Sequence, residues 1–500
     1  MKHRIVRAVG LTAAAAAIVL GTLSAQPPIL AAPSPAGYRA ASPEYGLSIF
    51  LYGNPATTDR DLAKIQALGF GWQKSLFRWR DIEAAGKGQF DWAESDRVVQ
   101  ASTAAGMKII ARLDFPPSWA RADGANNGAP DNYHDFADFV RAFVDRYKAG
   151  SPNGTVQAIE VWNEVNLQRE WGSPISPQSA AGYVRLLKLA YQAAKAADST
   201  VTVISAGLSP TGWSDDTAQP DDQFMQWLFD AGMKGSYDVL GGNGNVQCPS
   251  VDAQPGACPV MADRMAHPSF YFRRIEQLRD IMVAAGDADK QIWLMEFGWT
   301  TDTVNPSYSW YATTEAKKAD LIVQAFQFAN KSWSPWIGVM TLWTLADPHW
   351  GQSDEQTWWS VTNPDGTTRP AYDRLVQAIA ANQLPMVTPP VAAPTAKPTA
   401  KSAAKPTEAP ATPVAGAGPA APPPATAPSP EMLRVSGTDG DGLSLRDAPS
   451  AIATRLKTLP EGTVVRATGD PRQADGLTWR NVSDPNGNQG WVVGDYLTPA

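Results

Sequence analysis

Short apolar runs alternate with longer amphipathic segments between residues 45 and 382. The apolar runs have the length of strands, and the segments between them carry apolar residues three or four positions apart, as helices packed on a core do. The predicted strands cover 46–52, 70–79, 107–114, 156–163, 201–207, 237–243, 291–297 and 337–343. The predicted helices cover 57–69, 93–105, 132–149, 178–197, 221–231, 268–285, 314–330 and 369–382.

Eight strands that alternate with eight helices predict an α/β fold with parallel strands joined by helical crossovers. A closed (β/α)8 TIM barrel is the economical architecture for about 340 residues of this kind, and a doubly wound open sheet is the alternative. The pattern therefore predicts a barrel domain over 45–382.

The pattern changes after the last predicted helix. Residues 384–430 are rich in Pro, Ala and Thr and contain no aromatic residue. Such a segment cannot bury a core, so we expect a disordered, extended linker. Residues 432–500 alternate in short β-like runs separated by Gly- and Asp-rich turns, which predicts a small all-β barrel.

The amino terminus has the pattern of a secretory signal. Lys2, Arg4 and Arg7 precede an apolar run of small residues that extends to about residue 25. The run is short for a membrane span, so a cleaved signal peptide over 1–25 is favoured over an uncleaved anchor. We expect a secreted protein with no membrane span after signal removal.

Charge and cysteine content narrow the choice of partner. The net charge is −7 and no basic cluster is present, which argues against a nucleic-acid partner. The two cysteines, Cys248 and Cys258, lie in one loop, and we expect a local disulfide there, with two free thiols as the alternative. His267 is the only histidine nearby, so no metal site is predicted. No cofactor is expected either.

Two predicted strands end in a glutamate. The run "IEVWNEVNLQREW" (159–171) brings Asn163, Glu164 and Asn166 to the end of the fourth strand, and "QIWLMEFGW" (291–299) brings Glu296 to the end of the seventh. Either glutamate alone could equally be a loop carboxylate. In a barrel, however, the carboxyl ends of the strands meet at one mouth, where active sites lie. Two facing carboxylates can split a glycosidic bond.

Tryptophan is abundant, with 19 residues, and part of that number must serve the core. Indole rings also stack on the apolar faces of sugars, so the excess favours a carbohydrate ligand. Five tryptophans fall in the loops after the seventh and eighth strands, where they could line a glycan site: Trp299, Trp310, Trp350, Trp358 and Trp359.

The strand-end motifs carry a family resemblance. "WNE" ending the fourth strand and "EFGW" ending the seventh, together with "LWTLADPHW" and "RPAYDRL", resemble glycoside hydrolase clan A and, within it, the family 39-like branch. This resemblance covers essentially all of 45–382. It implies a retaining O-glycosyl hydrolase with Glu164 as the acid/base and Glu296 as the nucleophile. It also implies that Asn163 bonds the sugar 2-hydroxyl and that Trp343 stacks under the sugar. The other residues expected to bind the substrate are Lys74, Arg78, Asn166, Asn243 and Trp299.

The sequence departs from that family at two strands. By spacing, Lys74 takes the place of the usual arginine of strand two, although Arg78 shares its face. Strand six offers Asn243 where the family has a histidine followed by a tyrosine. These departures motivate an alternative function, a carbohydrate-binding barrel that has lost turnover. Arg112 and Asp114 are expected near the mouth, either as a structural ion pair or as part of the site.

The C-terminal unit resembles the bacterial Src-homology-3-like (SH3-like) domain, from "GLSLRDAPS" through "TLPEGTVVRATG" to "GWVVGDYL". That resemblance implies binding to cell-wall material or peptide, and the alternative is an inert appended barrel. The combined expectation is a secreted enzyme that acts on a polysaccharide and carries a small β binding module.

Overall fold

The computed structural model describes residues 38–384, except 126, 255–256 and 259–266, and residues 431–500, except 437–441, 450–452, 454 and 475–476. The predicted signal peptide (1–25) and all of the predicted linker (384–430) apart from Leu384 lie outside the described residues. Among the described helices, none combines the length and the apolar character needed to cross a membrane.

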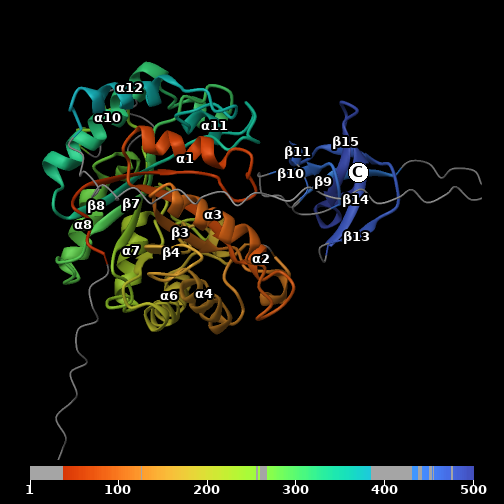
Figure 1. The fold of residues 1–500 in the computed structure, drawn as a ribbon, viewed down its shortest axis with the longest axis horizontal. Helices are drawn as coiled ribbons and strands as arrows, with labels where there is room; N and C mark the ends of the chain where they lie inside the picture. The colour runs from red at the N-terminus through yellow and green to blue at the C-terminus, as the bar shows by residue number, and fades with distance from the viewer. Residues whose placement is uncertain are drawn as a thin grey trace, which may run out of the picture. The chain divides into compact units, whose positions relative to one another are not determined.

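The N-terminal unit is a barrel of parallel strands (Figure 1). Its hydrogen-bonded order is β5-β4-β3-β2-β1-β8-β7-β6, and parallel bridges between Ile204 and Val239 and between Leu208 and Gly242 join β5 to β6. The predicted TIM barrel is thus confirmed, and the alternative of a doubly wound open sheet is wrong. The strands are β1 (Glu44–Ser48), β2 (Trp72–Arg78), β3 (Lys108–Asp114), β4 (Ala158–Val161), β5 (Thr202–Ser205), β6 (Leu240–Asn245), β7 (Ile292–Gly298) and β8 (Ile337–Leu342).

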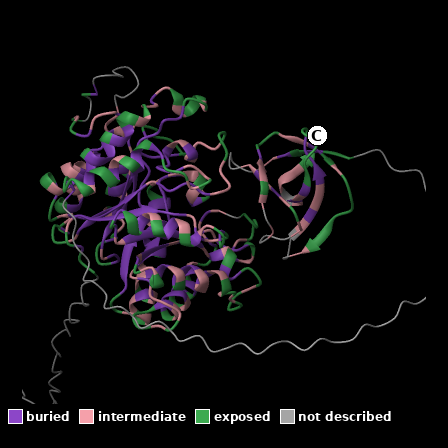
Figure 2. Ribbon diagram, turned by 45° about the horizontal axis from the view of Figure 1, so that its top comes forward, coloured by how far each residue is buried: buried purple, intermediate pink, exposed green. Residues whose placement is uncertain are grey.

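A helix covers each crossover, and its apolar stripe faces the strands. In α4, for example, Phe136, Phe139, Val140 and Phe143 are buried, and Figure 2 shows the exposed residues on the outer faces of the helices. The main helices are α1 (Thr58–Ala67), α3 (Ala93–Ala104), α4 (Tyr133–Tyr147), α6 (Pro177–Ala197), α7 (Asp221–Asp230), α8 (Arg274–Ala284), α10 (Glu315–Ser332) and α12 (Pro370–Ala380).

Sequence analysis missed four short helices and overextended one long helix. The short helices are α2 (Trp79–Ile82), α5 (Gln168–Trp171), α9 (Pro306–Ser309) and α11 (Gln356–Trp359), and each lies in a loop at the carboxyl ends of the strands. Each of these helices has four residues, which is too short to show the hydrophobic periodicity of a helix. The segment predicted as a helix from 268 instead begins with a separate 3₁₀ turn, Pro268–Phe270, before α8.

The barrel interior is layered. An apolar layer contains Trp72, Ile110, Ala158, Ile204, Val239, Trp293, Met295 and Val339. Side chains two residues apart share one face of a strand, so Lys74, Arg112 and Glu160 lie directly above this layer. The barrel therefore has an apolar floor below a layer of buried charges.

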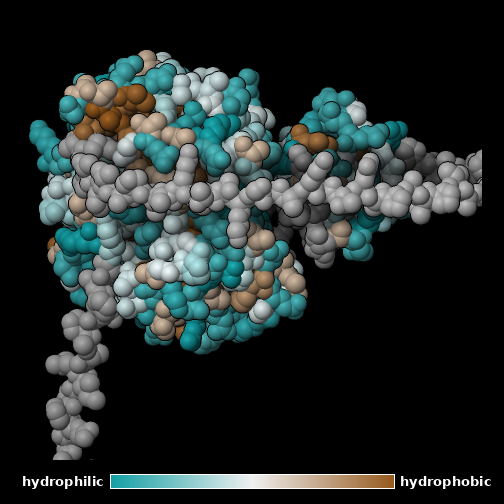
Figure 3. All heavy atoms as spheres, in the orientation of Figure 1, coloured by the Kyte–Doolittle hydropathy of each residue, from teal (hydrophilic) through white to brown (hydrophobic). Residues whose placement is uncertain are grey.

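Both ends of the barrel unit extend slightly past the predicted limits of 45 and 382. Ala40 belongs to the apolar floor, and Leu384 is buried in the core between the barrel and its helices. Figure 3 shows a largely hydrophilic face of this unit, with apolar residues in a few separate areas.

The C-terminal unit is a separate antiparallel β structure, as predicted. Its strands pair in the order β11-β10-β15-β14-β12-β9-β16, with β13 beside β14. Alternate residues such as Leu443, Leu445, Val482 and Val492 form its own apolar core. The strands are β9 (Met432–Val435), β10 (Leu443–Arg446), β11 (Arg455–Leu459), β12 (Val464–Ala467), β13 (Arg472–Ala474), β14 (Leu477–Ser483), β15 (Gln489–Val493) and β16 (Leu497–Pro499).

Candidate active site

Glu164 lies on a strained turn just after β4. Trp162 has φ 70° and Glu164 has φ 42°, a left-handed conformation that is a genuine outlier for a bulky residue such as Trp. Such strain persists only where the surroundings hold it, and it is concentrated at functional sites. Here the Trp162 ring packs against Phe136 and Trp171, with ring centroids 5.4 Å and 5.8 Å away. Trp162 is thus a packing residue that fixes the turn beneath Glu164.

Both oxygens of the Glu164 carboxylate have a partner. Asn243 Nδ2 donates to Oε1 at 3.2 Å, and Arg169 Nη2 donates to Oε2 at 3.1 Å. Glu164 is only 4 % exposed, whereas the Arg169 side chain is 63 % exposed. The buried carboxylate therefore has a largely exposed partner, Arg169. Sequence analysis missed this arginine, although its position five residues after Glu164 in a polar loop could have suggested it.

Glu296, on β7, is brought to the same end of the barrel. Asn243 pairs with Glu296 in the register of β6 and β7, and Asn243 also bonds Glu164. Lys74 Nζ lies 3.1 Å from Glu296 Oε1, and Arg112 Nη1 lies 4.0 Å from the same oxygen. The two predicted carboxylates thus belong to one polar cluster, which also includes Lys74 and Arg112.

Burial raises the pKa of Glu296, and the nearby Glu164 and Glu160 add to the increase while Lys74 and Arg112 oppose it. Burial alone would lower the pKa of Lys74, but Glu160 and Glu296 outweigh that effect and raise it. The lysine is therefore an ammonium group at neutral pH. The positive charges of Lys74 and Arg112 therefore favour the ionised form of the buried Glu296.

A further carboxylate, Glu170, borders the site. Arg112 Nη2 and Arg169 Nε each lie 3.9 Å from its oxygens, and burial raises its pKa to about 7. Arg112 also donates to Asp114 Oδ2 at 2.6 Å. The pair predicted near the mouth therefore exists, and through Arg112 it reaches Glu296.

Besides Oε2 of Glu160, which contacts Lys74 as an ion pair, three buried oxygens in this cluster have no hydrogen-bond partner. They are Oδ1 of Asn163, Oδ1 of Asn243 and Oδ1 of Asp114, on side chains of residues that are 4 %, 3 % and 1 % exposed. Buried polar atoms normally have partners, so such atoms call for an explanation. All three are acceptors, so the group that would satisfy them must bring donors, as sugar hydroxyls do.

Gly207 makes room for Asn243. A Cβ at this glycine would lie 2.2 Å from Asn243 Oδ1, and its backbone oxygen accepts from Glu164 N at 2.9 Å. Only a residue without a side chain leaves the amide beside Glu164. This requirement could not be predicted from the sequence, because it arises where the segments that follow β5 and β6 meet.

Two residues expected to bind sugar have structural partners instead. The Asn166 amide group holds a neighbouring loop, because Nδ2 donates to the backbone oxygens of Ser209 and Gln219, both at 2.8 Å. Arg78 Nη1 donates to Asp81 Oδ2 at 3.4 Å, with 40 % of its side chain exposed. Neither contacts the two carboxylates in this structure.

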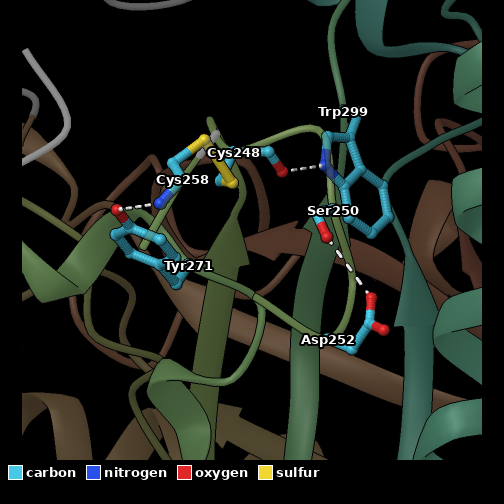
Figure 4. The surroundings of a disulfide bond; sticks show 6 residues. All are labelled: Cys248, Ser250, Asp252, Cys258, Tyr271 and Trp299. Atoms are coloured by element: carbon cyan, nitrogen blue, oxygen red, sulfur yellow. Dashed lines mark hydrogen bonds between the residues drawn. A yellow bond between two sulfur atoms is a disulfide. The ribbon is translucent and has the colours of Figure 1, made fainter. Parts of the chain in front are cut away.

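The two predicted tryptophans differ. Trp343 follows β8, is half-buried, and packs edge-on against Phe50 with ring centroids 5.8 Å apart. Trp299 is only 1 % exposed, and its Nε1 donates to the backbone oxygen of Cys248 at 2.9 Å (Figure 4). Trp343 is therefore partly accessible, whereas Trp299 is buried and supports the cysteine loop.

Cys248 and Cys258 form a disulfide with Cα atoms 5.8 Å apart. The Tyr271 hydroxyl accepts from Cys258 N at 3.2 Å, and the two cysteines pack with Tyr271 in a small buried cluster (Figure 4). The disulfide thus ties together the loop that follows β6. Within the described ranges, no three His, Cys, Asp or Glu side chains are arranged to hold a metal ion.

No protein-family model matches the sequence, and no curated protein matches it. Among solved structures, a glucosidase from Croceicoccus marinus is similar with a TM-score of 0.50 and 13 % identity, over 68 % of this chain and 68 % of that one. A family 39 glycoside hydrolase from Bacteroides cellulosilyticus WH2 has a TM-score of 0.49 and 16 % identity, over 90 % of this chain and 72 % of that one. GH5_18 from Streptomyces cattleya has a TM-score of 0.49 and 14 % identity, over 69 % and 82 %. These neighbours are glycoside hydrolases, and at such identities the likeness is one of fold.

Proposed function

We propose that this protein is a retaining glycoside hydrolase that cleaves β-glycosidic bonds of a polysaccharide. The observation that carries the proposal is the pair of strand-end carboxylates, Glu164 and Glu296, within a cluster of buried acceptors that have no partner. Two carboxylates are the chemical requirement for glycoside hydrolysis. Unpartnered acceptors beside them suit a ligand rich in hydroxyl groups.

In the first half of the reaction, Glu296 attacks the anomeric carbon while Glu164 protonates the leaving oxygen. The glycosidic C–O bond breaks, and a bond from a Glu296 oxygen to the anomeric carbon forms. In the second half, Glu164 accepts a proton from water, and the water oxygen displaces Glu296. Lys74 and Arg112 favour the ionised form of Glu296 before attack.

Arg169 must give way before Glu164 can act. It donates to Glu164 Oε2, the side of the carboxyl that the leaving oxygen would have to approach in the first step. Because the Arg169 side chain is largely exposed, its displacement by the leaving group breaks few other contacts. Asn163 and Asn243, whose Oδ1 atoms lack partners, are the residues we assign to sugar hydroxyls, with Trp343 beneath the ring.

A second candidate is a carbohydrate-binding barrel without turnover. Two observations favour it: strand six carries Asn243 in place of a histidine and a tyrosine, and burial raises the pKa of Glu296, which disfavours a nucleophile. Hydrolysis of a broad β-glycan panel separates the two, because binding without product would support this candidate.

We further propose that the protein is exported and that residues 432–500 bind cell-wall material. The signal-like amino terminus supports export. The SH3-like sequence motifs, on a unit with its own core, support a binding module. Pull-down of the protein with and without residues 432–500 on purified cell walls tests this, and equal retention of both forms would contradict it.

Azide rescue tests the roles of the two glutamates. Glu296→Ala removes the nucleophile, so azide should enter the vacated space and give a glycosyl azide of inverted configuration. Glu164→Ala should still form the intermediate from an activated aryl glycoside, and azide should then give a retained product. Glu94→Ala, on the outer helix α3, is a matched control that should hydrolyse normally. If the two variants gave products of the opposite configurations, the roles of Glu164 and Glu296 would be exchanged. An inverted sugar from the unmodified enzyme would refute the retaining mechanism.

A further inference from the structure

A third carboxylate, Glu160, lies beneath the two strand-end glutamates. It projects from β4 into the barrel and is 0 % exposed. Its Oε1 accepts from Gly207 N at 3.3 Å, and its Oε2 lies 2.9 Å from Lys74 Nζ. An ionised carboxylate at this depth needs a partner, and Lys74 is that partner.

Lys74 is held by three acceptors at once. Its Nζ lies 2.9 Å from Glu160, 3.1 Å from Glu296 and 3.3 Å from the backbone oxygen of Met295. The contact with Glu160 is an ion pair, and the ammonium group donates hydrogen bonds to Glu296 and to the backbone oxygen of Met295. Lys74 therefore bridges the proposed nucleophile and a carboxylate that reaches no solvent.

The charges of this trio change during the proposed reaction. While Glu296 is ionised, one cation is shared between two carboxylates. When Glu296 becomes the glycosyl ester, its negative charge disappears. Without Glu160, Lys74 would then be a buried cation whose remaining close acceptor is a backbone oxygen, which is costly in a site of low polarity.

We propose that Glu160 is a positioning residue that acts through Lys74. It holds the ammonium group beneath Glu296 and remains as its counter-ion while Glu296 is esterified. This inference rests on the proposed function and adds to it a residue that never touches the substrate. In each half-reaction the bonds and the proton are those given above, and Glu160 neither gains nor loses a proton.

Other charged groups act on the same trio and must stay unchanged in any test. Glu296 is influenced by Glu164 and Arg112 besides Lys74 and Glu160. Glu160 also acts on Tyr183, whose hydroxyl donates to Val161 O at 2.9 Å. Arg112 in turn contacts Asp114 and Glu170. Replacing Glu160 by its isosteric amide changes the charge of this network while keeping its shape.

The first measurement needs no substrate. The full-length protein is labelled with ¹³C at the glutamate side-chain carboxyls, and the Glu296 signal is assigned with Glu296→Gln. In Glu160→Gln, Lys74 is no longer shared between two carboxylates, so the midpoint of the Glu296 titration should fall by about one pH unit. Glu276→Gln, on α8, is the matched control and should leave the midpoint unchanged. An unchanged midpoint in Glu160→Gln would overturn the proposal.

The second measurement follows the intermediate formed from an activated aryl glycoside. Losing the buried ion-pair partner of Lys74 should slow the glycosylation step of Glu160→Gln by roughly 10- to 100-fold. In a Lys74→Met background the same substitution should cause no further slowing, because Glu160 acts through Lys74 and its removal there relieves the repulsion of Glu296. Equal losses in both backgrounds would overturn the role through Lys74.

The two measurements also separate this inference from the proposed function. If the unmodified protein forms no intermediate from any glycoside, the proposed function fails, while the titration still reports whether Glu160 acts on Glu296. If Lys74→Met does not fold, the titration of Glu160→Gln alone decides.

Discussion

Replacing Lys74 by methionine should destabilise the barrel strongly. The variant keeps a chain of similar length but leaves Glu160 and Glu296 buried without their shared cation. One Nζ contacts both carboxylates, so their nearest oxygens lie no more than about 6 Å apart, and at an effective dielectric constant of about 20 they repel by about 3 kcal/mol. Breaking a buried pair by removing one partner costs about 3–5 kcal/mol. We expect a loss in that range.

The loss should depend on pH with a definite sign. Without the ammonium group the two carboxylates raise each other's pKa in the folded state above the unfolded value. A raised carboxyl pKa contributes stability at low pH that is lost as the pH rises through the folded pKa. The deficit of Lys74→Met relative to the unmodified protein should therefore be larger at about pH 8 than at about pH 5.

Urea unfolding at both pH values measures this. Lys148→Met is the matched control, because Lys148 lies 2.8 Å from Asp145 but both side chains are largely exposed, so its loss should stay below about 1 kcal/mol. If Lys74→Met cost no more than this control at either pH, the assignment of Lys74 as the charge that stabilises two buried carboxylates would be wrong.

Two further predictions concern activity on an activated aryl glycoside. Burial raises the pKa of Glu296, and a nucleophile must be ionised. The acidic limb of the pH profile of kcat/KM should therefore have a midpoint above the ordinary range of glutamate pKa values. A midpoint within that range would contradict this prediction. Gly207→Ala should displace Asn243 and lower kcat/KM by roughly 10- to 100-fold. Gly71→Ala is the control, because a Cβ there meets nothing within 4 Å, and it should leave kcat/KM unchanged. Equal values for the two variants would show that the position of Asn243 is unimportant.

The sequence by itself determined the elements and their order. Strands and helices follow from periodicities of two and about 3.6 residues, which are local properties, so all eight strands and eight crossover helices could be placed. The number and alternation of elements then predicted a barrel, and the barrel placed Glu164 and Glu296 at one mouth. Every step up to that point needed only neighbours along the chain and the rule that parallel strands end together.

Tertiary structure alone decided which side chains meet inside the barrel. Lys74 contacts Glu296 across a separation of 222 residues, and Glu160 lies beneath both because β2, β4 and β7 point side chains into one layer. Those meetings depend on strand register and barrel closure, which no local pattern encodes. The same closure buried Trp299 and turned Asn166 toward a loop, although both lie in motifs that resemble sugar-binding ones. Burial and charge, which set the pKa of Glu296, are therefore properties of the closed barrel and of no single strand.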